Sequence, residues 1–133
     1  IPDYFSAWQE LILFDVENNT LTGEPLAWLD GTQDVNDDTG MLVPNLRFFR
    51  LSHNRFQGSI TTDVARQLSS IQQLWMAGNN FTGQIPNEIE IFTEMEDLFL
   101  YNNHFTGTMP DLLRSLDLSR LQIQNNRFVG TLP

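Results

Sequence analysis

One short motif recurs five times along the chain, and it restricts the folds that are open to this sequence. The copies read ENNTLTGEP from Glu17, SHNRFQGSI from Ser52, GNNFTGQIP from Gly78, NNHFTGTMP from Asn102 and NNRFVGTLP from Asn125. Each copy contains an asparagine that can be aligned with the others, and successive asparagines lie 35, 25, 24 and 23 residues apart. A repeat of 20–50 residues is the sequence signature of a repeat architecture. Three of these four spacings lie near one value, and the longest requires an insertion of about ten residues.

The residues around each aligned asparagine also agree from copy to copy. Apolar residues stand five and three positions before it, and a glycine stands four positions after it. An apolar residue that alternates with a variable one predicts a short, half-buried strand. The glycine predicts a tight turn that a Cβ atom would obstruct. The predicted strand pairs are Phe14 and Val16, Phe49 and Leu51, Leu74 and Met76, Leu98 and Leu100, and Leu121 and Ile123.

The combined pattern LxxLxLxxNxFTGxIP resembles the leucine-rich repeat, and its TGxIP tail resembles the plant-type subclass of that family. This subclass occurs in receptor-like kinase ectodomains, receptor-like proteins and polygalacturonase-inhibiting proteins. The resemblance implies an α/β fold, namely a right-handed solenoid. A parallel β-sheet would form its concave face, and short helices or 3₁₀ turns would form its convex face.

The resemblance covers nearly all of residues 1–133, which we expect to form one segment of about five repeats with an insertion at 30–40. The asparagine ladder would be Asn19, Asn54, Asn79, Asn103 and Asn126. Both ends of the sequence fall in mid-repeat, and solenoids need polar caps at their ends. We therefore expect the segment to be an excerpt of a longer array.

Each repeated position has a predicted structural role. The asparagine amides should bond backbone groups of their own turn and of the adjacent turn, because buried backbone groups must be paired. The phenylalanines that follow the asparagines should stack in a column through the core. Short helical turns are expected after Pro86 and Pro110, and a turn with good N-terminal capping chemistry is expected at Thr61–Asp63.

The residues between the buried strand positions should point outward on the concave face. Aromatic residues together with arginine are typical of binding hot spots. Ser52 and Ala77 are also expected to face outward, as are Gln73, Asp97 and Arg120, although we do not include them in the site. The alternatives are a surface covered by a neighbouring segment, or scattered aromatic residues without a partner. The predicted ligand-binding residues are Phe48, Arg50, His53, Trp75, Phe99, Tyr101 and Gln122.

The insertion DGTQDVNDDTG contains an incomplete calcium-loop pattern in Asp34, Asn36 and Asp38. Compared with a calcium-binding loop, its glycine lies one position too late, and no glutamate follows at the position where that loop needs one. The alternative is a solvated surface loop. We predict no other metal site and no cofactor. Two sequons make Asn18 and Asn80 candidates for glycosylation if the protein is secreted.

Charge and composition exclude several classes of function. The chain carries 17 acidic residues against 7 arginines, and it contains no lysine, an absence for which we have no physical explanation. A net charge of −10 argues against a nucleic-acid partner. No apolar run is long enough to insert into a membrane. His53 and His104 lie 51 residues apart without partners at a recognisable spacing, so we do not expect an enzyme.

These observations predict a non-catalytic module that recognises a protein or peptide ligand through its concave face. As the resemblance implies, it would be part of a receptor-like or secreted protein, either extracellular or membrane-anchored with the repeats outside. One alternative is an inhibitor of a cell-wall-degrading enzyme. Another is a structural or adaptor subunit of a larger assembly.

Overall fold

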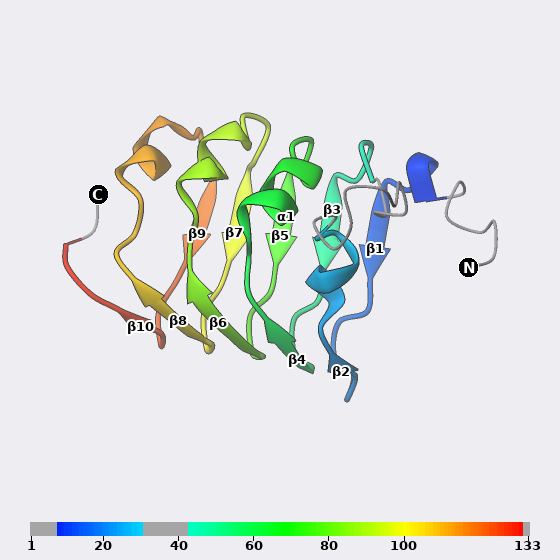
Figure 1. Cartoon of the computed structure of the whole chain (residues 1–133), viewed down its shortest axis with the longest axis horizontal. Helices are drawn as coiled ribbons and strands as arrows, with labels where there is room; N and C mark the ends of the chain where they lie inside the picture. The colour runs from blue at the N-terminus through cyan, green and yellow to red at the C-terminus, as the bar shows by residue number, and fades with distance from the viewer. Residues whose placement is uncertain (1–7, 31–42, 132–133) are drawn as a thin grey trace.

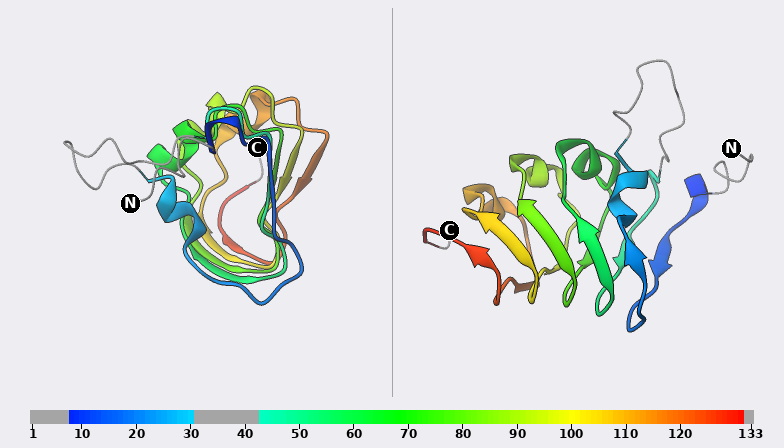
Figure 2. Two further views of the ribbon diagram at one scale, coloured as in Figure 1. Left: turned by 90° about the vertical axis from the view of Figure 1, so that its right-hand side faces the viewer. Right: turned by 60° about the horizontal axis from the view of Figure 1, so that its bottom comes forward.

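The chain forms a coil whose successive turns stack side by side, as the computed structural model of residues 8–30 and 43–131 shows. Each turn contributes one strand to each of two parallel sheets. The first sheet contains β1 (Leu13–Asp15), β3 (Phe48–Arg50), β5 (Gln73–Trp75), β7 (Asp97–Phe99) and β9 (Arg120–Gln122), in that order. Viewed along the coil, the turns superpose around a common core (Figure 2). The expected solenoid with its parallel sheet is confirmed.

A second parallel sheet lies where the sequence predicted only turns. It contains β2 (Thr22–Gly23), β4 (Arg55–Gly58), β6 (Asn80–Gln84), β8 (His104–Gly107) and β10 (Arg127–Phe128). These strands begin after each aligned asparagine, so the turn predicted there is itself extended and paired with its neighbours. The repeated glycines lie in or just after these strands with positive φ, for example 84° at Gly83. They allow the chain to leave the sheet at a backbone angle that a side chain disfavours.

Short helical turns form the remaining side of the coil. They are η2 (Pro25–Trp28), α1 (Thr62–Gln67), η4 (Asn87–Ile91) and η5 (Asp111–Ser115). The hydroxyl of Thr61 accepts a hydrogen bond from the backbone N–H of Val64, which confirms the capping role expected at this position. Pro86 and Pro110 directly precede η4 and η5, where the missing N–H of proline costs no helical hydrogen bond.

The asparagine side chains bind the turns to one another, as expected. In Asn79, Oδ1 accepts a bond from the N–H of Phe56 in the preceding turn. Its Nδ2 contacts the carbonyl of Leu51 in that preceding turn and the carbonyls of Met76 and Ala77 in its own turn. Asn54, Asn103 and Asn126 make the corresponding contacts with their own turns and with the turns before them. The amide of Asn19, in the first turn, bonds the carbonyls of Val16 and Glu17 in its own turn.

The core runs through the middle of the coil. Phe81 and Phe105 are fully buried, and Phe105 stacks on Phe81 and on Phe128 at centroid distances of 6.3 and 6.2 Å. The predicted phenylalanine column is therefore present over these three turns. With the apolar side chains buried inward, the alternate residues of the first sheet are left on its outer face.

Candidate binding surface

The outer face of the first sheet carries the residues that the sequence singled out. Strand pairing places Arg50, Trp75, Phe99 and Gln122 in one row across four neighbouring strands, which we call the central row. A second row, two residues earlier in each strand, contains Phe48, Gln73, Asp97 and Arg120. We call it the lower row. The two rows bring five of the seven predicted binding residues onto adjoining strands.

Two aromatic rings and two guanidinium groups are stacked along these rows. The rings of Trp75 and Phe99 lie 5.2 Å apart with an angle of 19° between their planes. The guanidinium carbon of Arg50 lies 4.3 Å from the centre of the Trp75 ring and 5.7 Å from that of Phe48. The corresponding carbon of Arg120 lies 5.2 Å from the Phe99 ring. Such contacts are attractive because the face of an aromatic ring is electronegative.

Side chains of the lower row hold the two arginines in place. Arg50 donates two hydrogen bonds to Oε1 of Gln73, at 3.2 Å from Nε and 2.6 Å from Nη2. A longer ion pair of 3.5 Å joins it to Asp15. Arg120 donates from Nε and Nη2 to the two carboxylate oxygens of Asp97, which makes a two-pronged ion pair. This hydrogen bonding to Asp97 raises the pKa of Arg120 above its ordinary value, so the guanidinium stays charged.

Sequence reasoning placed Gln73, Asp97 and Arg120 on this face but left them out of the site. The signal that could have included them is the strand register, because the repeat alignment puts Asp97 directly opposite Arg120 on the next strand. Opposite charges at facing positions of neighbouring strands form favourable pairs. Asp97 was expected to face outward, and its side chain is only 3% exposed because Arg120 covers it.

Replacing Arg120 with glutamine should lower the melting temperature, because it leaves a buried carboxylate without its cation. The matched control is Arg66→Gln, which removes an arginine from an ion pair whose acid, Asp63, is 32% exposed. Exposed pairs contribute little to stability, so the control should melt close to wild type. Thermal unfolding followed by circular dichroism measures both. Equal melting temperatures for the two variants would mean that Arg120 does not stabilise Asp97.

A second aromatic pair, formed by His53 and Tyr101, lies just beyond the central row. Their rings are 6.2 Å apart, and the Tyr101 hydroxyl lies 3.5 Å from Nε2 of His53. Gly78 makes room for this pair, because a Cβ atom there would lie 2.7 Å from Nδ1 of His53. Gly78 and His53 both have positive φ, of 63° and 58°. The two remaining predicted residues thus extend the surface by contact with each other.

Ser52 and Ala77 do not contribute to the surface, contrary to expectation. Their exposed fractions are 3% and 0%. Both follow the strand ends, where the chain begins to turn inward. Their side chains are also too short to rise between larger neighbours such as His53 and Trp75.

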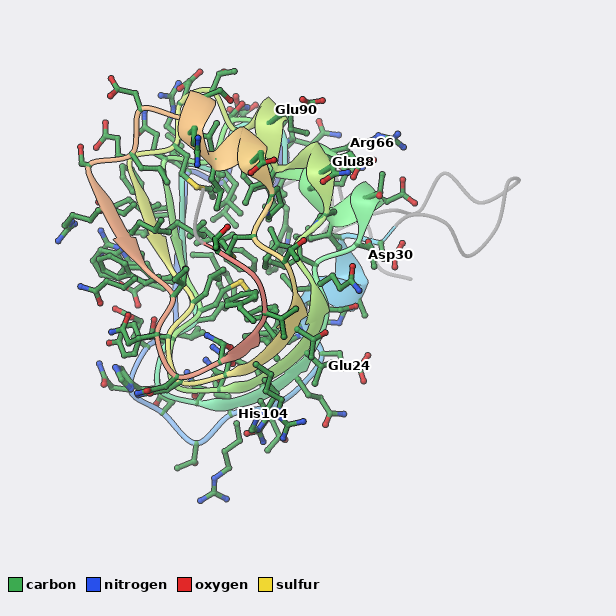
Figure 3. All side chains as sticks on the ribbon, turned by 90° about the vertical axis from the view of Figure 1, so that its left-hand side faces the viewer. Glu24, Asp30, Arg66, Glu88, Glu90 and His104 are labelled. Carbon is green, nitrogen blue, oxygen red and sulfur yellow. The ribbon has the colours of Figure 1, made fainter. Side chains whose placement is uncertain are left out.

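The other predicted sites lie elsewhere or outside the described residues. The calcium candidates Asp34, Asn36 and Asp38 belong to residues 31–42, which the structure does not describe. Asn18 and Asn80 are both exposed, and their glycosylation remains a prediction. His104 is exposed at the start of β8 in the second sheet (Figure 3).

The described residues also give no support to a metal site or a membrane span. Within 8–30 and 43–131, no three His, Asp or Glu side chains gather closely enough to hold a metal ion. None of the helices in these two ranges is long and apolar enough to cross a membrane.

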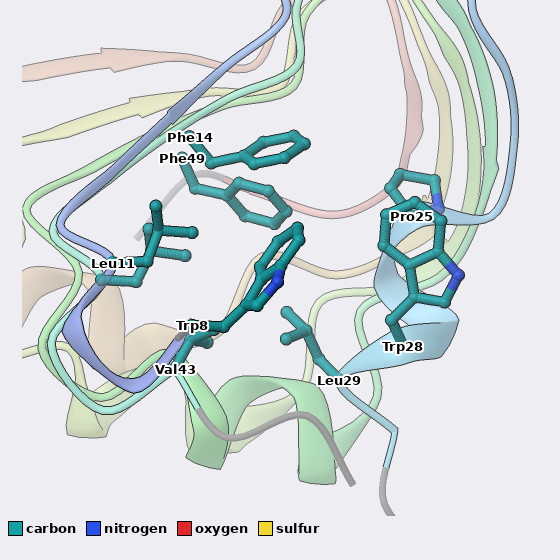
Figure 4. Close-up of a pocket in the computed structure, with 9 residues that line it drawn as sticks. Trp8, Leu11, Phe14, Pro25, Trp28, Leu29, Val43 and Phe49 are labelled. Atoms are coloured by element: carbon teal, nitrogen blue, oxygen red, sulfur yellow. The ribbon is translucent and has the colours of Figure 1, made fainter. Parts of the chain in front are cut away.

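An apolar groove at the first turns of the coil is a separate feature (Figure 4). Binding sites usually combine apolar walls with a few polar groups that fix the ligand's orientation. The surface exposed inside this groove is apolar, and the residues that line it are Trp8, Leu11, Phe14, Pro25, Trp28, Leu29, Val43, Leu46 and Phe49. Its Trp28 side chain remains 58% exposed. The groove is therefore a weaker candidate than the two stacked rows.

Comparison with known proteins gives a family and several relatives. The Leucine Rich Repeat family model matches residues 45–66, 70–91 and 94–116, which is about half of the chain. Two relatives from Arabidopsis thaliana are Receptor-like protein 35, 30% identical over 139 residues, and Receptor-like protein 18, 31% identical over 133 residues. Each alignment covers 99% of this chain but only 14% of the relative.

A solved structure extends the likeness to the fold. It is the crystal structure of the Arabidopsis receptor kinase HAESA in complex with the peptide hormone IDA and the co-receptor SERK1. It superposes with a TM-score of 0.81 at 26% sequence identity, over 99% of this chain and 20% of that one.

Proposed function

Because the chain belongs to the leucine-rich-repeat family, we propose that it is a non-catalytic module that recognises a peptide or protein segment. The ligand would lie across the outer face of the first sheet. The observation that carries the proposal is the stacked pair of Trp75 and Phe99, flanked by Arg50 and Arg120. Tryptophan is enriched at binding hot spots, and here the Trp75 ring is already stacked on Phe99 before any ligand arrives.

The relatives support the same proposal at a coarser level. They are receptor-like proteins, and the HAESA receptor kinase, which shares the fold, was solved with a peptide hormone and a co-receptor. We place the repeats of this chain outside the cell on that basis, in a secreted or membrane-anchored protein. The exposed Trp28 and Val129 at opposite ends of the coil support a longer array, in which further repeats would cover them.

Peptide selection tests the proposed surface. Dodecapeptides selected on the purified chain from a random phage library should bind Trp75→Ala at least about tenfold more weakly than wild type, as measured by calorimetry. The reason is that truncation of a hot-spot residue costs about 2 kcal/mol or more. Tyr101→Ala should weaken binding in the same direction. The control is Trp28→Ala, which removes an exposed tryptophan from the first turns of the coil and should leave affinity unchanged. Selected peptides that bind wild type and Trp75→Ala equally well would show that this face is not the site.

A further inference from the structure

The indole N–H of Trp75 is buried and has no hydrogen-bond partner. Among the side chains that the structure describes, its Nε1 is the one buried nitrogen or oxygen atom in this condition. Buried polar groups are almost always paired, and an exception in a folded protein requires an explanation. This exception lies at the centre of the proposed binding surface, which suggests that the N–H has a partner in the bound state.

The neighbours of the Trp75 ring show what keeps this N–H from solvent. Strand β5 lies between β3 and β7, so Arg50 flanks the indole from one side and Phe99 from the other. Phe99 offers no acceptor atom in its side chain. Arg50 offers only donors, because a guanidinium group has no free lone pair to accept a hydrogen bond. Neither neighbour can therefore satisfy Nε1.

The two arginines that border the stack are held with unequal strength. Arg120 is bound by both oxygens of a buried carboxylate, so moving it would uncover the charge of Asp97. Arg50 is bound mainly by the neutral amide oxygen of Gln73, and its ion pair with Asp15 is long and partly exposed. Hydrogen bonds in which both partners are charged are stronger than those to a neutral amide. Arg50 is thus the cover that can move while the rest of the stack stays in place.

We propose that Arg50 is a displaceable latch over Trp75, and that the ligand replaces it with an oxygen atom that accepts the Trp75 N–H. The ligand part of this inference rests on the proposed function. The chemistry defines the ligand group as a carbonyl or carboxylate on a peptide segment that packs against the indole. Gln73 is then a positioning residue, because it holds Arg50 in the closed arrangement.

Hydrogen exchange of the indole N–H tests the latch without any ligand. The chain has three tryptophans, and the Trp75 signal in a ¹⁵N spectrum is identified as the one missing from Trp75→Phe. In Arg50→Ala this signal should exchange with deuterated water at least about tenfold faster than in wild type, and Gln73→Leu should shift it in the same direction. Arg47→Ala, which removes an exposed arginine paired with Glu94, should leave the rate unchanged. Equal exchange in wild type and Arg50→Ala would overturn the latch.

Peptide affinity tests the acceptor. For dodecapeptides selected on the wild-type chain, Trp75→Phe keeps an aromatic ring but loses the donor, and it should weaken binding about tenfold, the loss of one well-placed hydrogen bond. Arg50→Ala should instead strengthen binding severalfold, because the ligand no longer has to displace the latch. Weaker binding to Arg50→Ala, or unchanged binding to Trp75→Phe, would overturn the proposal.

The two experiments separate the latch from the proposed function. Changing acidic residues of the peptides to alanine, which removes their side-chain acceptor oxygens, distinguishes a carboxylate acceptor from a backbone carbonyl, since only the former loses affinity. If no peptide is enriched, or if the selected peptides bind Trp75→Ala as tightly as wild type, the proposed function and the ligand acceptor both fail. Faster exchange in Arg50→Ala would still show in that case that Arg50 covers Trp75.

Discussion

Replacing Phe105 with alanine is expected to lower the free energy of unfolding by about 3–5 kcal/mol, the usual cost of truncating a buried phenylalanine. Phe105 has no exposed surface and is stacked between Phe81 and Phe128. The cavity left by its ring would interrupt the column at the interface of three turns. Repeat proteins depend on such interfaces between neighbours, because a single turn cannot bury its own apolar face. Urea denaturation followed by circular dichroism measures the loss.

The matched control is Phe99→Ala on the outer face of the first sheet. Phe99 is partly exposed, so its truncation leaves less of a cavity and should cost clearly less stability. The two variants should rank in the opposite order for peptide binding, since Phe99 stacks on Trp75 while Phe105 faces the core. Similar stability losses in both variants would mean that the column of rings does not hold the turns together.

The sequence predicts the fold well because the same positions recur under the same physical constraint. Leu74, for example, is buried in the core, as are its counterparts Leu98 and Phe49 in the neighbouring strands. The asparagine and glycine positions were likewise readable, since each serves a backbone need that no other side chain serves as well. The second sheet was missed because its strands are two to five residues long and coincide with the turn motif.

The surface was predicted less completely, because alternation along a strand identifies outward residues but not the contacts between strands. Trp75 and Phe99 could be found from their position alone. The bond from Arg50 to Gln73 and the ion pair of Arg120 with Asp97 depend on how long side chains reach diagonally or directly across to the next strand. The burial of Ser52 depends on the size of its neighbours, which a repeat pattern does not specify.

Asn79→Ala should lower the free energy of unfolding by about 3 kcal/mol, because several backbone groups lose their partner at once. The Oδ1 atom is the acceptor for the buried N–H of Phe56, at 3.0 Å. The Nδ2 atom lies 3.0–3.2 Å from the carbonyls of Leu51, Met76 and Ala77. Asn79 itself is only 6% exposed, so water cannot readily replace the amide. Leaving a buried polar group unpaired costs about 1–3 kcal/mol, and here at least the N–H of Phe56 is left in that state.

The next residue supplies the control, since Asn79 and Asn80 are adjacent and chemically identical. Asn80 is exposed on β6, so Asn80→Ala should change stability by less than about 0.5 kcal/mol. Urea denaturation of both variants compares one side chain in the ladder with one outside it. Because Asn79 bridges two turns, its loss should uncouple them as well as weaken each, and the unfolding transition should broaden. A loss in Asn79→Ala no larger than in Asn80→Ala would show that the ladder accompanies the fold without stabilising it.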